Sequence, residues 1–171
     1  ASKARSSSSH ELKKCRSCST LLNLSSTIDT MDFDLLKIAE TWSFWDGELP
    51  TALPRRVELP EDLSASLALV IQGVRRCGKS TLMSQLIQRY SLDPVHCAFI
   101  NFEDPRLARA QTFETLEEFV AAFRARHEGI EELYFFLDEI QGVDGWQKWL
   151  RMQVDRPSGN HFVVTGSNAT L

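Results

Sequence analysis

The sequence has no apolar run long enough to cross a membrane. A spanning helix needs roughly 20 consecutive apolar residues, and no stretch of the 171 residues approaches that length. The first residues also lack the apolar middle region of a secretory signal. Both absences argue against a membrane protein and against a secreted one. We therefore expect a cytoplasmic protein that makes no membrane contact.

The sequence also lacks a complete set of cysteine metal ligands and an excess of positive charge. Of the four cysteines, only Cys15 and Cys18 have a spacing typical of metal ligands, and no second pair follows to complete a zinc site. Residues 1–30 hold five Lys or Arg and two Asp or Glu, so the totals of 19 and 23 leave the rest of the chain with a net charge of −7. An acidic body does not favour nucleic acid as a partner.

Composition divides the chain into three predicted parts. Residues 1–30 are rich in serine and weakly patterned, as in a disordered leader. Residues 31–66 read as a helix followed by a linker that three prolines punctuate. Residues 67–171 alternate between short apolar strands and helical patterns, with strands at 67–72, 95–102, 133–137 and 161–165 and helices at 79–90, 113–127 and 144–154. This order predicts an α/β fold whose parallel sheet is flanked by helices.

The segment "GVRRCGKS", residues 73–80, fits the pattern Gly-x4-Gly-Lys-Ser at a junction from strand to helix. The N–H groups of such a loop and of the following helix suit a polyphosphate. Lys79 would reach the β- and γ-phosphates, and Ser80 would bind Mg²⁺. A chance Lys-Ser in an ordinary turn does not explain the apolar flanks on both sides. We therefore predict a nucleotide site made of Gly73, Val74, Arg75, Arg76, Cys77, Gly78, Lys79, Ser80 and Thr81.

A second block, "LYFFLDEI" at residues 133–140, is an apolar strand that ends in two acids. Asp138 can support the Mg²⁺ shell, and Glu139 can polarise a water for attack on the γ-phosphate. Acid pairs also occur in solvated turns, but these two end at the sheet edge where ligands bind. The pair favours ATP hydrolysis over transfer to a small acceptor.

The predicted fourth strand ends in Thr165, Ser167 and Asn168. A polar side chain there can contact the γ-phosphate or the attacking water, but Gly166-Ser167-Asn168 is equally good turn chemistry. The residues alone leave both readings open.

Together, "VIQGVRRCGKSTLMSQLI", "INFEDPRL", "FFLDEIQGVDGWQKWLR" and "VVTGSN" resemble the AAA-type ATPase domain of a prokaryotic family in which a P-loop core precedes a C-terminal domain of poorly defined role. The resemblance covers residues 40–171. It implies an AAA+-like core, with "GVRRCGKS" as Walker A, "FFLDE" as Walker B and Asn168 as the catalytic sensor 1 residue, Ser167 being the next best match. It also implies that Asn101 holds Glu139 inactive until a ligand arrives, although an Asn at a strand end is often a turn former.

The same resemblance implies a fifth core strand, a helical lid with a sensor arginine and a C-terminal domain, and none of them follows the fourth strand here. We therefore expect the core of this chain to be incomplete and its hydrolysis to be weak or absent.

Several other residues have two interpretations. Arg75 and Arg76 can steer nucleotide or meet a neighbouring subunit, or they can simply be solvated. Trp146 and Trp149 lie three apart on a helix and fit a core or interface stripe better than a base-stacking platform. Glu103, Asp104 and Arg106 can support the site or pair at the surface.

Two classes of function follow from these observations. The first is a Mg²⁺-dependent ATPase that drives or regulates a protein partner, whose identity the sequence does not reveal. The second is a nucleotide-gated binding module with little turnover. Glu139 favours the enzyme, and the lack of an arginine finger in this chain favours the second class, a nucleotide-gated switch. A homo-oligomer is compatible with both.

Overall fold

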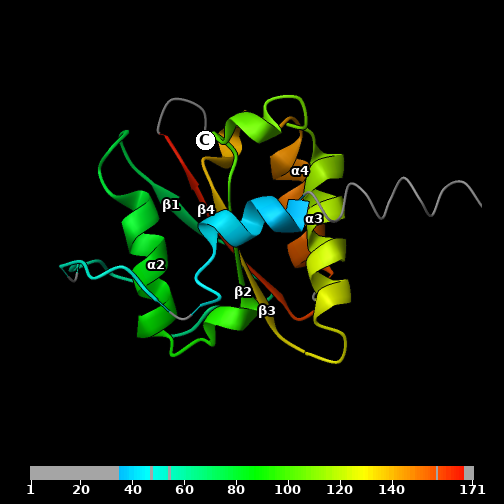
Figure 1. Cartoon of the computed structure of the whole chain (residues 1–171). Coiled ribbons are helices and arrows are strands. Elements are labelled where there is room, and N and C mark those ends of the chain that lie inside the picture. The colour runs from blue at the N-terminus through cyan, green and yellow to red at the C-terminus, as the bar shows by residue number, and fades with distance from the viewer. Residues whose placement is uncertain (1–34, 47, 54, 157, 168–171) are drawn as a thin grey trace, which may run out of the picture.

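The computed structural model describes residues 35–46, 48–53, 55–156 and 158–167. Within them, four parallel strands form one sheet in the order β1-β4-β3-β2 (Figure 1). The strands are β1 (Leu69–Gln72), β2 (Cys97–Asn101), β3 (Leu133–Asp138) and β4 (Asn160–Gly166). The predicted α/β fold with a parallel sheet is confirmed. The predicted leader, residues 1–30, lies outside the described residues.

Each strand-to-strand connection carries helical structure. The α-helices are α2 (Lys79–Arg89), α3 (Phe113–Arg126) and α4 (Trp146–Asp155), and the short 3₁₀ turns are η1 (Pro94–His96), η2 (Pro105–Leu107) and η3 (Ile140–Gly142). A further helical segment runs through residues 35–42. No helix in the described part of the chain has the length and apolar character that crossing a membrane requires.

The helices cover both faces of the sheet (Figure 1). Successive strand residues point to opposite faces, so Phe99 and Phe136 pack with Met83 of α2, whereas Ile100 and Phe135 belong to the cluster that contains α3 and α4. Strands β2, β3 and β4 are therefore largely apolar and buried, as expected where both faces of a parallel sheet are covered, whereas alternate residues of β1 are exposed.

The helical segment at residues 35–42 packs on the face that α3 and α4 cover. Leu35, Ile38 and Ala39 are buried in that cluster. Trp146 and Trp149 of α4 are buried in it as well. The core interpretation of the two tryptophans is thus confirmed, and neither ring is free to stack on a base.

The carboxyl ends of the strands meet at one edge of the sheet. Asn101 at the end of β2 lies beside Asp138 at the end of β3, and Gln72 at the end of β1 lies beside Gly166 at the end of β4. Every loop that leaves this edge therefore emerges close to the others, and the chemically interesting side chains gather there.

Candidate functional site

The loop between β1 and α2 follows a tight path that two residues with positive φ permit. Arg76 has φ 64° and Gly78 has φ 84°, and the N–H of Cys77 donates to the carbonyl of Val74 at 3.3 Å. Helix α2 begins directly afterwards, at Lys79. Because the first N–H groups of a helix have no partner within it, this end of α2 presents partial positive charge to the loop.

Glycine is needed at two places in the loop. A Cβ on Gly73 would lie 2.7 Å from Sγ of Cys77, so only glycine allows the loop to close this tightly. Gly78 has a positive φ, which glycine adopts without strain. The guanidinium of Arg55 also lies against Gly78, where it leaves no room for a Cβ, and donates to the carbonyl of Cys77. Arg55 comes from the segment before β1 and therefore ties that segment to the loop.

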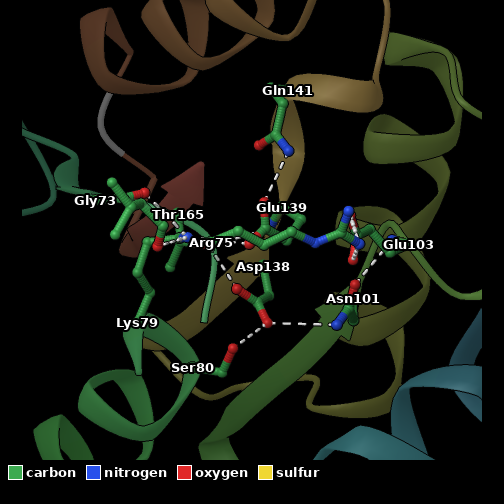
Figure 2. Close-up of polar contacts among 11 residues, drawn as sticks. Gly73, Arg75, Lys79, Ser80, Asn101, Glu103, Asp138, Glu139, Gln141 and Thr165 are labelled. Carbon is green, nitrogen blue, oxygen red and sulfur yellow. Dashed lines mark hydrogen bonds and ion pairs between the residues drawn. The ribbon is translucent and has the colours of Figure 1, made fainter. Parts of the chain in front are cut away.

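The carboxylate of Asp138 is the centre of the polar cluster at the strand ends (Figure 2). It is 5% exposed, and Oδ2 accepts from Oγ of Ser80 at 2.6 Å and from Nδ2 of Asn101 at 3.4 Å. Its Oδ1 accepts from Oγ1 of Thr165. Side chains from α2, β2 and β4 thus converge on the last residue of β3.

Glu139 follows Asp138 with its backbone in the left-handed region, at φ 53°. Its N–H donates to Oγ1 of Thr165 at 3.0 Å, so that one hydroxyl holds both acids in place. The Glu139 carboxylate is engaged at both oxygens: Oε1 lies 3.1 Å from Nζ of Lys79, and Oε2 accepts from Nε2 of Gln141 at 2.7 Å (Figure 2).

Lys79 is folded back onto its own loop. Its Nζ donates to the carbonyls of Gly73 at 3.3 Å and Val74 at 3.4 Å, in addition to its pair with Glu139. The ammonium group is buried, so these three acceptors replace water around the charge. The cation that the sequence predicts to bind a phosphate is therefore held at the loop by two backbone carbonyls and one carboxylate.

The donor set around Asp138 fits Mg²⁺. Ser80 and Asp138 supply oxygen atoms at one point, and Mg²⁺ prefers oxygen ligands and often takes only one or two carboxylates from the protein, with water and phosphate completing its shell. The described residues contain no cluster of three or more His, Cys, Asp or Glu side chains arranged to hold a metal ion by themselves. A cavity of about 260 Å³ adjoins Ser80 and Asp138 and is walled in part by Trp42, Phe44 and Phe99.

The other candidate residues are distributed unevenly around this cluster. Arg75 forms an exposed ion pair with Glu103 at 2.9 Å, which connects the loop to the segment after β2. Asp104 is buried and accepts from Arg106 and from Nε1 of Trp42, so its role is to fix the chain after β2. The hydrogen bond from the Arg106 guanidinium holds the pKa of this carboxyl well below its usual range.

Asn101 and Thr165 contact the acids at the strand ends, and Gln141 adds a contact that the sequence did not predict. Asn168 lies outside the described residues, so its proposed sensor role stays a prediction, and Thr165 is the residue of β4 that contacts both acids. Within the described residues, Asn101 donates to Asp138, whereas the amide that donates to Glu139 belongs to Gln141. Sequence reasoning missed Gln141, and its only signal was an amide two residues after a predicted catalytic acid.

Comparison with known proteins identifies a family whose model matches most of the described chain. The family model described as "AAA domain" matches residues 65–171. An uncharacterized protein of Methanocaldococcus jannaschii is 38% identical over 102 residues, which cover 60% of this chain and 21% of that protein. An uncharacterized protein of Haemophilus influenzae is 35% identical over 106 residues, which cover 60% of this chain and 26% of that protein. The chain thus spans about a fifth to a quarter of these relatives, and no solved structure matches it significantly.

Proposed function

Because the chain belongs to the AAA domain family, we propose that it binds Mg·ATP at residues 73–81 and hydrolyses it. One observation carries the proposal: Ser80 and Lys79, side by side at the start of α2, contact Asp138 and Glu139, which are neighbours at the end of β3. The two residues proposed to bind the metal and the cation with the proposed base thus lie next to each other, beside the loop proposed to bind phosphate.

In the proposed reaction, Lys79 leaves Glu139 and the two loop carbonyls and binds the β- and γ-phosphates. Ser80 and Asp138 would hold Mg²⁺, which would neutralise charge on those phosphates. Glu139 orients a water and accepts its proton as the water oxygen bonds to the γ-phosphorus. The bond from that phosphorus to the bridging oxygen breaks, and its electron pair leaves with ADP.

A specific observation favours the second candidate, a nucleotide-gated switch with little turnover. Both carboxylate oxygens of Glu139 are occupied, one by Lys79 and one by Gln141. In this arrangement Lys79 and Gln141 occupy the carboxylate that would orient the water, so hydrolysis would require Lys79 to move. A chain that binds nucleotide without completing this rearrangement would hold ATP and change its partner surface.

Under either candidate we propose that the chain acts on a protein partner. We also propose that a second copy of the chain supplies the arginine that speeds hydrolysis.

The variant Glu139→Gln separates the two candidates. It keeps the size of the side chain and removes the proton acceptor, so it should bind Mg·ATP as tightly as the wild type does. A positioned base contributes about 10²- to 10⁴-fold in rate, and phosphate release should fall by that factor if the chain is an ATPase. Glu128→Gln, at an exposed position after α3, is the matched control and should leave the rate unchanged.

Two results would decide against the enzyme. Tight ATP binding with phosphate release that does not differ between wild type and Glu139→Gln would support the switch. Loss of ATP binding in Glu139→Gln would mean that this carboxylate holds the loop together and does not act as the base.

A further inference from the structure

Gln141 contacts the predicted base directly. Its Nε2 donates to Oε2 of Glu139 at 2.7 Å, and Figure 2 shows the amide directed at that carboxylate from the turn after β3. A carboxylate can only accept, so the amide must present its NH₂ group to Glu139. The other amide atom, Oε1, is buried and has no hydrogen-bond partner within the described residues.

The turn that carries Gln141 is firmly placed. Gln141 is the middle residue of η3, and Ile140 before it and Val143 after it are buried in the core. The side chain of Gln111 lies against Gly142, where a Cβ would be 3.2 Å from its Oε1, and the backbone carbonyl of Gln111 accepts from the N–H of Asp144 at 3.0 Å. The backbone that carries Gln141 is therefore held by core packing on both sides and by a hydrogen bond just after the turn.

We propose that Gln141 is a positioning residue for Glu139 in ATP hydrolysis, an inference that rests on the proposed function. By holding Oε2, Gln141 leaves Oε1 as the oxygen that accepts the proton of water once Lys79 has moved from Oε1 to the phosphates. The hydrogen bond also keeps the carboxylate from following Lys79. The unpartnered Oε1 of Gln141 is then an acceptor for a donor that enters with the substrate, since a buried acceptor without a partner is unfavourable.

A purely structural role makes a different prediction. A residue that only supports the loop would, when replaced, weaken nucleotide binding and catalysis together. A positioning residue acts on the transition state alone, so its loss lowers kcat and leaves KM and ADP affinity unchanged. It should also weaken binding of ADP with aluminium fluoride, which imitates the transferring phosphoryl group, without any need for turnover.

The test is Gln141→Met in the full chain, because methionine is similar in shape and cannot donate to Glu139. We expect kcat, and the affinity for ADP with aluminium fluoride, to fall by about ten- to a hundredfold, as for one hydrogen bond to a charged group. ADP affinity should change by less than about twofold. Gln153→Met is the matched control, because Gln153 donates to Oε1 of Glu117 at 3.0 Å in an equivalent pair away from the site, and it should change neither quantity.

A second comparison tests whether the effect passes through Glu139. In a Glu139→Gln background, Gln141→Met should change the affinity for ADP with aluminium fluoride by less than about threefold, because interacting residues are not additive. Three results would overturn the inference. The affinity for ADP with aluminium fluoride could fall equally in both backgrounds, it could stay unchanged in Gln141→Met, or the affinity for ADP alone could fall in parallel with it. If the wild type binds ADP but neither turns ATP over nor gains affinity with aluminium fluoride, the inference fails while nucleotide binding stands. If the wild type binds no nucleotide, both proposals fail.

Discussion

Two cysteines of the described part of the chain differ in environment, and only one adjoins the proposed phosphate site. Cys77 lies in the loop between β1 and α2 and is half-buried. Cys97 begins β2, is buried, and desolvation raises its pKa to about 12. A thiol attacks as the thiolate, so Cys97 should be inert at neutral pH and serves as an internal reference.

We therefore expect thiol reagents to modify Cys77 much faster than Cys97, and Mg·ATP to protect Cys77. At a concentration ten times the dissociation constant, ATP should slow the modification of Cys77 about tenfold, in proportion to the free fraction. Peptide mass spectrometry would separate these two thiols from Cys15 and Cys18. Equal rates with and without ATP would contradict placement of the phosphates on this loop.

The lowered pKa of Asp104 predicts how the unfolding free energy depends on pH. Hydrogen bonds from the Arg106 side chain are the main cause that lowers the pKa of this carboxyl, and Trp42 adds another donor. A group whose folded pKa is lowered stabilises the fold fully above its unfolded pKa, near 4, and this contribution is lost as pH falls through the folded value. The difference in unfolding free energy between wild type and Asp104→Asn should therefore be largest near neutral pH.

That difference should shrink steadily as pH drops below about 4. Urea unfolding at a series of pH values measures it. Asp155→Asn is the control, because Asp155 forms an exposed pair with Arg151 at 3.6 Å and should show little pH dependence. A difference that stays constant from neutral to acid pH would mean that the charge of Asp104 does not stabilise the fold.

Among the elements, the connection before β4 is under tight steric control. Gly159 has φ 72°, and a Cβ there would lie 1.9 Å from the carbonyl oxygen of Glu131. That close approach lets the Gly159 carbonyl accept from the N–H of Leu133 at 2.9 Å, where β3 begins. Gly129 has a similar φ of 85°, but nothing lies within 4 Å of the position of its Cβ.

These two glycines allow strain and clash to be measured separately. Gly129→Ala should cost about 1–2 kcal/mol of unfolding free energy, because alanine disfavours the left-handed region. Gly159→Ala should cost a further 1–3 kcal/mol or so, since the backbone of Glu131 must shift. Denaturant unfolding measures both variants, and equal losses would show that the close approach at Gly159 contributes nothing.

The sequence predicted the elements themselves well, because buried parallel strands are apolar throughout. The differences lie at their ends. β1 begins at Leu69 and not at 67, where Leu67 is exposed, and β2 begins at Cys97 because Pro94 opens the turn η1, which Asp93 caps. Propensity defines the middle of an element, whereas its ends depend on caps and neighbours.

The site was predictable only in part. A loop motif and two acids after a strand are local patterns, and the structure brings Ser80 to Asp138 and Lys79 to Glu139. The contacts of Gln141 and Thr165 with the acids depend on the left-handed backbone of Glu139 and on the register of β4. Neither can be read from the spacing of residues, because both depend on side-chain direction in the folded chain.

At the scale of the whole molecule, the sheet order explains why the site exists. β1 lies at one edge of the described sheet beside β4, and β3 follows, so the loop after β1 faces the acids at the end of β3 with Thr165 between them. Helix α2 on one face and α3 with α4 on the other hold these strands in register (Figure 1). The proposed nucleotide site is thus a consequence of parallel strands ending together.

The most direct test of the central claim is equilibrium binding of Mg·ATP to the wild type and to Lys79→Ala. The account predicts saturable binding that weakens about ten- to a hundredfold in the variant, or about 1.5–3 kcal/mol, because one charge-assisted contact to the phosphates is lost. Lys148→Ala, at an exposed position on α4, should bind like the wild type. Unchanged ATP affinity in Lys79→Ala, with the variant still folded, would contradict the account.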